Sequence, residues 1–303
     1  MLNPAFPYPS ADEGIANYIL PKELADRTLQ GNAALNSGPE RRLQRIFTFE
    51  IWTKLKALGL NKLAWPKLKV LDVCCGTGFL SYHLLSIVPI HELMLLDTSK
   101  MELKEAETLL AKNFPRARVS YSRLDLLKTG FPSSSFDLII GNSFLHHLHD
   151  LPCAIQELHR LLRPGGMFAT LHEPTPVAIA YESGSWDLIY QFRKQGSSYV
   201  DLLRKGKAVA DDGVIDVWLF EGKTLAKLFG VEGFEAIRVV PWNLIRPILV
   251  ARRKLHLDAI KPALSPWEQI LFALSILSDA GLRRCLPAPA FGALSVAACK
   301  PLC

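Results

Sequence analysis

The sequence lacks the cysteine spacing of a disulfide scaffold or a zinc module. Six cysteines occur among 303 residues. Cys74 and Cys75 are adjacent, the other four are widely separated, and no C-x-x-C pair exists. We therefore expect reduced thiols, no structural metal and a cytoplasmic location.

Long apolar runs are missing as well. No stretch of about 18 apolar residues occurs, so no membrane-spanning helix is predicted. The first ten residues hold three prolines and no basic apolar segment, so we do not expect a signal peptide.

A continuous basic stripe is also absent, although the formal net charge is +6. Lysine and arginine are scattered, and the densest cluster is Arg252-Arg253-Lys254. Nucleic-acid binders carry longer basic patches with interleaved aromatic residues. Nucleic acid is therefore not the expected partner.

What is present is a regular alternation of short apolar strands with helices. The predicted strands are 69–73, 92–96, 117–122, 136–140 and 167–172, and the helices between them are 79–88, 100–113 and 151–162. This order predicts right-handed crossovers and a parallel sheet covered on both faces. The nearly continuous apolar character of the strands is typical of buried parallel strands.

Polar residues follow the carboxyl ends of these strands, where open parallel sheets bind their ligands. Asp72 precedes the loop Cys74-Cys75-Gly76-Thr77-Gly78, whose glycines allow a tight turn and a close approach of the backbone to a ligand. A carboxylate such as Asp97 can accept hydrogen bonds from both hydroxyls of a ribose, and Asp125 from an adenine amino group.

Five motifs in this order resemble the class I S-adenosylmethionine-dependent methyltransferases. They are Asp72 to Gly78, Asp97, Leu124-Asp125-Leu126, Phe136 to Ile140, and Leu161 to Gly166. The resemblance covers about residues 69–173 and implies S-adenosylmethionine as cofactor. The residues that it implies for binding are Asp72, Cys74, Gly76, Gly78, Asp97, Thr98, Asp125, Leu126, Asn142 and Ser143.

The resemblance also implies the fold, an α/β domain with a Rossmann-like, seven-stranded, mostly parallel sheet. The expected organisation is a helical N-terminal cap at 1–68, with a helix at 41–58, and a methyltransferase domain at 69–303. Within that domain we expect a core at 69–174, a lid insertion after the fifth strand at 175–220, a sixth strand at 236–240, a helical insertion at 242–289 and a closing strand at 291–299.

The loop departs from the family pattern at Cys74, which replaces the first glycine. A small residue is tolerable there if its φ stays negative. Cys74 and Cys75 are expected to pack rather than to act as nucleophiles. A dinucleotide fingerprint would need a third glycine where Ser81 stands, so a dehydrogenase is not favoured.

Methyl transfer from a sulfonium mainly needs positioning and desolvation, and a base only if the acceptor loses a proton. His172 and Glu173, after the fifth strand, are the candidate bases, and His147 is expected near the cofactor. The alternative is that each histidine is simply hydrogen-bonded or solvent-facing. A metal site is not expected, because the adjacent His146 and His147 cannot face the same way on a helix.

The acceptor is expected to be a small, hydrophobic molecule such as a lipid, polyketide, isoprenoid or quinone. Asn142-Ser143-Phe144-Leu145 lacks the proline pair of enzymes that methylate amino groups of DNA or protein, and the cap and insertions are rich in apolar residues. The apolar stretch that begins at Trp267, beside Arg283 and Arg284, leaves three roles open: burial against the core, a homodimer face, or peripheral membrane contact. Two alternatives stay open: a non-catalytic module that binds the cofactor, which belongs to another functional class, and an RNA methyltransferase.

Overall fold

The computed structural model describes residues 41–60, 67–148, 150–175, 177, 220–244 and 266–302. The N-terminal part of the predicted cap, nearly all of the predicted lid insertion and the first part of the predicted helical insertion therefore lie outside the described residues.

The described residues form one seven-stranded sheet, in the order β3-β2-β1-β4-β5-β7-β6. The strands β1 to β5 are parallel to one another, and β7 is antiparallel to both β5 and β6. This arrangement confirms the predicted mostly parallel, Rossmann-like sheet. The bounds are β1 Lys69–Val73, β2 Glu92–Asp97, β3 Val119–Arg123, β4 Phe136–Asn142, β5 Leu162–Pro174, β6 Glu235–Trp242 and β7 Ala293–Cys299.

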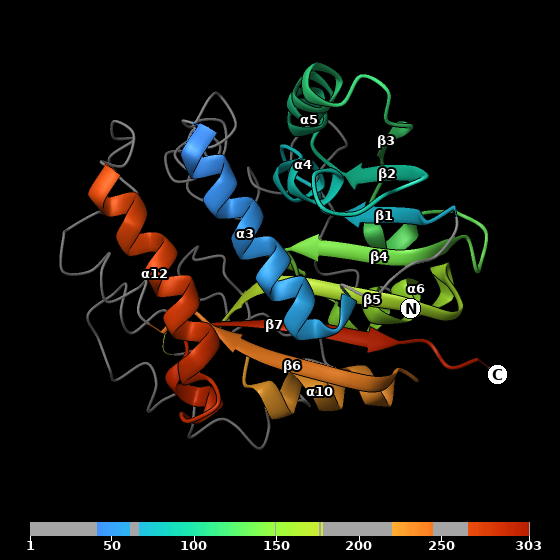
Figure 1. The fold of residues 1–303 in the computed structure, drawn as a ribbon. Coiled ribbons are helices and arrows are strands. Elements are labelled where there is room, and N and C mark those ends of the chain that lie inside the picture. The colour runs from blue at the N-terminus through green and yellow to red at the C-terminus, as the bar shows by residue number, and fades with distance from the viewer. Residues whose placement is uncertain are drawn as a thin grey trace, which may run out of the picture.

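Helices cover both faces of this sheet (Figure 1). One buried cluster joins the sheet to α3, α4 and α5, and a second joins it to α6 and α10. The bounds are α3 Arg41–Leu58, α4 Phe79–Leu85, α5 Lys100–Asn113, α6 Leu151–Leu161 and α10 Gly222–Val231. Burial on both faces explains why the strand sequences are almost continuously apolar.

Several predicted boundaries shift by one or more residues, among them the following three. The helix predicted at 79–88 ends at Leu85, and the third strand covers 119–123 instead of 117–122. The fifth strand begins at Leu162, because Leu162 pairs with Phe136 and Met167 pairs with Leu138. The predicted turn at Pro164-Gly165-Gly166 is thus a bulge within β5, where extra residues are accommodated between two paired positions.

A further helix, α12 (Pro266–Leu282), packs against α3. In Figure 1 both lie toward the side to which the arrowheads of β1, β2 and β4 point. These two helices therefore flank the edge of the sheet where ligands bind in folds of this kind. Of the helices in the described ranges, none is long and apolar enough to cross a membrane.

Candidate active site

Four carboxylates converge on the loop after β1. Burial raises the pKa of the Cys74 thiol well above its ordinary value, and Asp97, Asp125, Asp72 and Glu102 raise it further. The fold thus brings together the ends of β1, β2 and β3 and the first turn of α5. A raised pKa keeps the thiol protonated, which fits the packing role predicted for Cys74 and not a nucleophile.

Asp97 ties the first two strand ends together. Its Oδ2 accepts a hydrogen bond from the Gly76 N–H at 2.9 Å, and its Oδ1 accepts one from the Ser99 N–H at 2.9 Å. Burial raises the pKa of Asp97, and these N–H groups oppose that rise. Each oxygen keeps a lone pair for a ligand, so the carboxylate can hold the loop and bind a diol together.

Asp72 has one oxygen in use and one that has no partner. Its Oδ2 accepts from the Ser81 hydroxyl at 2.6 Å, whereas Oδ1 is buried without a hydrogen bond. Burial, with a smaller contribution from Asp97, raises the pKa of Asp72 to about 7. A buried carboxylate oxygen without a partner is costly, so its presence points to a ligand that supplies a donor or a positive charge.

Glu102 belongs to this group, although the sequence analysis did not select it. Burial and the charges of Asp97 and Glu105 raise the pKa of Glu102 to about 8. Its Oε2 would lie 4.0 Å from a Cβ added at Gly76, which otherwise meets open space. Glu102 could have been selected from the sequence by its position in the first turn of the helix that follows Asp97, since that turn lies beside the cofactor loop.

The loop backbone departs from the expectation for Cys74. Its φ is 51°, in the left-handed region, so the expected negative φ is wrong. The loop must turn sharply here to bring the Gly76 N–H to Asp97, and it does so at a residue that is not glycine. Gly78, at φ 81°, has a separate reason: a Cβ would approach the Cβ of Ala106 on α5 to 2.9 Å.

The remaining predicted cofactor residues lie at the same edge. Asp125 caps the short helix η2 (Leu126–Lys128) by accepting from the Leu127 N–H at 2.9 Å, and Leu126 is buried behind it. Thr98 is half-buried, and its carbonyl accepts from Arg123 at 3.0 Å. Asn142 and Ser143 are half-buried at the end of β4.

Glu173 is the centre of a buried network. It is 0% exposed and accepts hydrogen bonds from the N–H groups of Phe144, Leu145 and His146, from the Thr170 hydroxyl at 2.6 Å, and from the His146 ring at 2.8 Å. Burial opposes its ionisation, but the His146 contact and the other donors outweigh burial and lower the pKa of Glu173. Both oxygens are therefore engaged in holding the segment after β4, a geometry that favours positioning over proton transfer.

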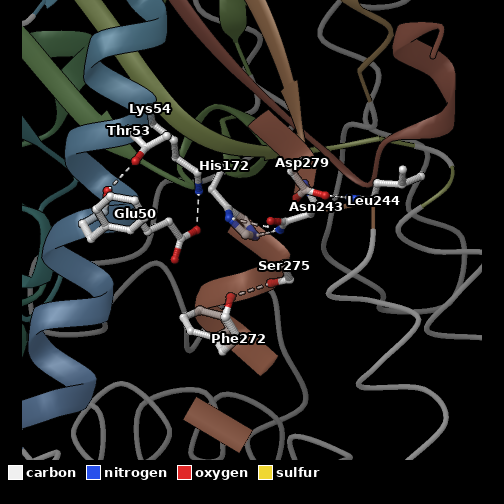
Figure 2. Close-up of polar contacts among 10 residues, drawn as sticks. Glu50, Thr53, Lys54, His172, Asn243, Leu244, Phe272, Ser275 and Asp279 are labelled. Carbon is white, nitrogen blue, oxygen red and sulfur yellow. Dashed lines mark hydrogen bonds and ion pairs between the residues drawn. The ribbon is translucent and has the colours of Figure 1, made fainter. Parts of the chain in front are cut away.

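His172 and His147 occupy different surroundings. His147 is half-buried and its ring lies against that of His146, with 3.9 Å between centroids. His172 is also half-buried, and Asn243 Nδ2 lies 3.3 Å from its Nε2. Figure 2 shows the His172 ring between α3 and α12, close to Lys54 and Asn243. The catalytic roles of His172, Glu173 and His147 stay predictions.

Metal-ligating side chains do not cluster in the described residues: no group of three or more His, Cys, Asp or Glu there could hold an ion.

Residues 70–166 match the family described as a methyltransferase domain. Those residues, about a third of the chain, are the part that is similar to methyltransferase domains. The matched region ends at the bulge in β5 and includes the loop at Cys74 with all four carboxylates.

Curated relatives of the methyltransferase domain include two demethylmenaquinone methyltransferases. The protein of Desulfitobacterium hafniense is 29% identical over 150 residues, which is 46% of this chain and 59% of that protein. The protein of Leptospira interrogans is 37% identical over 105 residues, 34% of this chain and 42% of that protein. The chain thus spans about half the length of these relatives.

Among solved structures, the [4+2]-cyclase SpnF has a TM-score of 0.51 at 16% identity, covering 84% of this chain and 81% of SpnF. At this identity the likeness concerns the fold, which supports more than one kind of reaction.

Proposed function

We propose that this chain transfers the methyl group of S-adenosylmethionine to a small, hydrophobic acceptor. The observation that carries the proposal is the group of carboxylates at the loop. Asp97 accepts from the Gly76 N–H, the Asp72 Oδ1 atom is buried without a partner, and Glu102 and Asp125 act on the same loop at Cys74. A cofactor with a sulfonium and an ammonium group suits these carboxylates, whereas a phosphate-bearing cofactor would be repelled.

The residues fit that cofactor in specific ways. Asp97 would accept from the ribose hydroxyls while it keeps Gly76 and Ser99 in place. The Asp72 Oδ1 atom, buried without a partner, would face a donor or a positive charge of the cofactor. Asp125 and Leu126 would flank the adenine, and Asn142 and Ser143 the donor methyl side. When bound, the cofactor supplies an electrophilic methyl group with a neutral thioether as leaving group.

On the acceptor side, the chain has to orient the acceptor, exclude water and take up a proton if one is lost. His172 is the proposed base, because its ring is half-buried at the carboxyl end of β5, whereas both oxygens of Glu173 are engaged in holding the segment after β4. The names of the two relatives support an acceptor of the quinone type. The lipid, polyketide and isoprenoid classes remain within the proposal.

Calorimetry with S-adenosylmethionine tests the cofactor half of the proposal, and mass spectrometry with reduced naphthoquinones tests the transfer. We expect binding, and a mass gain of one methylene group in the product. Absence of binding at millimolar cofactor would refute the proposal. Binding without transfer across the acceptor classes would favour a non-catalytic module, and transfer to RNA alone would favour the RNA methyltransferase.

The predicted base has its own test within the same assay. His172→Ala should slow turnover with little change in cofactor affinity, because the ring lies at the end of β5, beyond the four carboxylates. Unaltered turnover would mean that proximity alone drives the reaction.

A further inference from the structure

A buried ion pair on α3 lies beside the candidate base. Lys54 is 2% exposed, and its Nζ lies 2.7 Å from Glu50 Oε1. Within the described residues this is the one hydrogen bond that the Lys54 ammonium makes, although an ammonium group carries three donors. Figure 2 shows Lys54 reaching from α3 toward the His172 ring.

A second donor near Lys54 has no partner at all. Trp242, the last residue of β6, is 2% exposed, and its Nε1 is buried without a hydrogen bond. The Lys54 Nζ lies 6.0 Å from the centroid of the Trp242 ring, and the Arg283 guanidinium carbon lies 4.6 Å from it. A buried tryptophan usually finds a partner for its N–H group, so this exception calls for an explanation.

The frame around these donors is held firmly. Asp279 on α12 accepts from the Asn243 N–H at 2.8 Å and from the Leu244 N–H at 3.2 Å, which fixes the chain directly after Trp242. Asn243 in turn lies against the His172 ring. The unused donors of Lys54 and Trp242 are therefore held at the same edge of the sheet as the candidate base. The hydrogen bonds of Asp279 and Asn243 that fix this region do not involve these donors.

We propose that Lys54 and Trp242 bind an oxygen atom of the methyl acceptor, a carbonyl or a hydroxyl group, on an otherwise apolar body. Both unused groups are donors, so their partner must be an acceptor of hydrogen bonds, and oxygen is the common one. The apolar body of this ligand follows from the proposed function, which assigns a hydrophobic acceptor to the same edge of the sheet. This inference rests on the proposed function, because it assigns the binding group of the same acceptor.

Equilibrium dialysis with 2-naphthol and naphthalene tests the inference, since the two probes share an apolar body and differ by one oxygen. The protein is dialysed with and without saturating S-adenosylhomocysteine, and calorimetry on the same samples records the binding of S-adenosylhomocysteine. We expect the unaltered protein to bind 2-naphthol about tenfold more tightly than naphthalene.

Two variants remove the donors separately. Trp242→Phe keeps an aromatic ring beside the Arg283 guanidinium and removes the N–H group. Lys54→Met combined with Glu50→Gln removes the ammonium without leaving a charge buried alone. Each should lower the preference for 2-naphthol severalfold and leave naphthalene binding unchanged. Lys104→Met, which removes an exposed lysine of another ion pair, should keep the full preference.

The outcomes separate the two proposals. Equal binding of both probes to the unaltered protein, or a preference that survives in both variants, overturns the inference even where S-adenosylhomocysteine binds normally. Failure of S-adenosylhomocysteine to bind refutes the proposed function instead. Trp242→Phe is the milder change, so it decides the matter if the double variant does not fold.

Discussion

At the scale of single residues, the carboxylates of the candidate site differ in their hydrogen-bond partners and therefore in their expected roles. Asp97 already accepts two backbone N–H groups, so the loop is built before a ligand arrives. Asp72 and Glu102 instead keep raised pKa values, about 7 and about 8, because burial disfavours their charge. The first arrangement favours preorganisation, and the second makes cofactor binding sensitive to protonation.

Asp97→Ala should weaken the binding of S-adenosylmethionine by more than about tenfold, because charge-assisted hydrogen bonds to the ribose would be lost. Isothermal calorimetry measures the change, and circular dichroism checks the fold. The cofactor affinity of Asp97→Asn should lie between those of the unaltered protein and Asp97→Ala, because the amide oxygen of asparagine still accepts a hydrogen bond. Unchanged affinity in a folded Asp97→Ala protein would contradict the ribose assignment.

Cofactor binding should release protons between about pH 6 and about pH 8. A raised pKa means that the folded protein without cofactor holds these protons, and a cationic ligand favours the charged carboxylates and lowers their pKa values. Affinity should therefore rise with pH, roughly tenfold for each unit by which binding lowers one pKa. Calorimetry in buffers of different ionisation enthalpy measures the proton release.

Two variants of α5 provide the control for that experiment. Glu102→Gln should reduce the release of protons in the upper part of the pH range, whereas Glu107→Gln, at an exposed position of the same helix, should leave it as it was. If the release were the same in all three proteins, Glu102 would have no part in the linkage.

The sequence predicted Asp72, Asp97 and Asp125 because each lies at or near the carboxyl end of a predicted parallel strand, and such strands end at one edge of the sheet. It did not predict Glu102, because its position in a mixed-charge helix looks like that of any solvated acid. Only the packing of α5 against the loop, visible in the contact of Gly78 with Ala106, shows that this face of the helix is covered.

At the scale of elements, four strands share an unusual ending. Cys74, Ser143, His172 and Asn243 lie at or directly after the ends of β1, β4, β5 and β6, and each has a positive φ, between 51° and 68°. Residues other than glycine seldom adopt this conformation, and such strain gathers at functional sites. The common feature thus marks one continuous edge, from the cofactor loop to the proposed acceptor side.

Glu173 links two of these elements, because it accepts hydrogen bonds from the segment after β4 while it belongs to β5. Glu173→Gln should lower the free energy of unfolding by about 3 kcal/mol, since an amide nitrogen would face buried N–H groups and the His146 contact would be weakened. Urea denaturation measures this. A loss below about 0.5 kcal/mol would contradict the positioning role.

The ionisation of Glu173 also makes the stability of the protein depend on pH. Its pKa is lowered in the folded state, so its contribution to stability is complete above the ordinary glutamate pKa and is lost as pH falls through the folded value. Glu92→Gln is a suitable control, because Glu92 is exposed and its ion pairs are at the surface. This variant should leave the free energy of unfolding nearly unchanged, because surface ion pairs contribute little to stability.

Among the elements, helix bounds were predicted best where the sequence carries a cap or a strong stripe. The helix 41–58 and the helix 100–113, which Ser99 caps, have the predicted bounds. The start of β5 was missed because proline and two glycines normally end regular structure, and only pairing with β4 shows that the strand continues through them. The network of Glu173 could not be predicted, since it depends on how the chain after β4 folds back.

At the scale of the whole molecule, α3 and α12 come from opposite ends of the chain and meet at one edge of the sheet. The composition of both segments predicted helices, but nothing in it predicted their contact. Phe47 of α3 and Phe272 of α12 make an edge-to-face contact at 5.5 Å, so the two helices stabilise each other beside the proposed acceptor donors.

The outer face of α12 carries an apolar stripe made of Trp267, Ile270, Leu274 and Leu277, which are between 47% and 63% exposed. The opposite face of α12 packs against α3 and buries Ile276 and Ser275, so the four exposed residues are left for a homodimer face or a membrane contact. Arg284 is exposed just after the helix, whereas Arg283 packs against the Trp242 ring, and the chain has a net charge of +6. An apolar stripe next to an exposed arginine, on a chain of net positive charge, matches the chemistry of an anionic lipid surface.

We therefore expect the protein to sediment with vesicles of phosphatidylglycerol and phosphatidylcholine, and less with phosphatidylcholine alone. Leu274→Glu combined with Leu277→Glu should abolish sedimentation, because two charges would enter the apolar contact. Met101→Glu combined with Val231→Glu alters exposed apolar residues elsewhere and should have no effect. Sedimentation unaffected by the α12 variants, or a dimer in the ultracentrifuge that these variants dissociate without any vesicle binding, would show that the stripe does not serve the membrane.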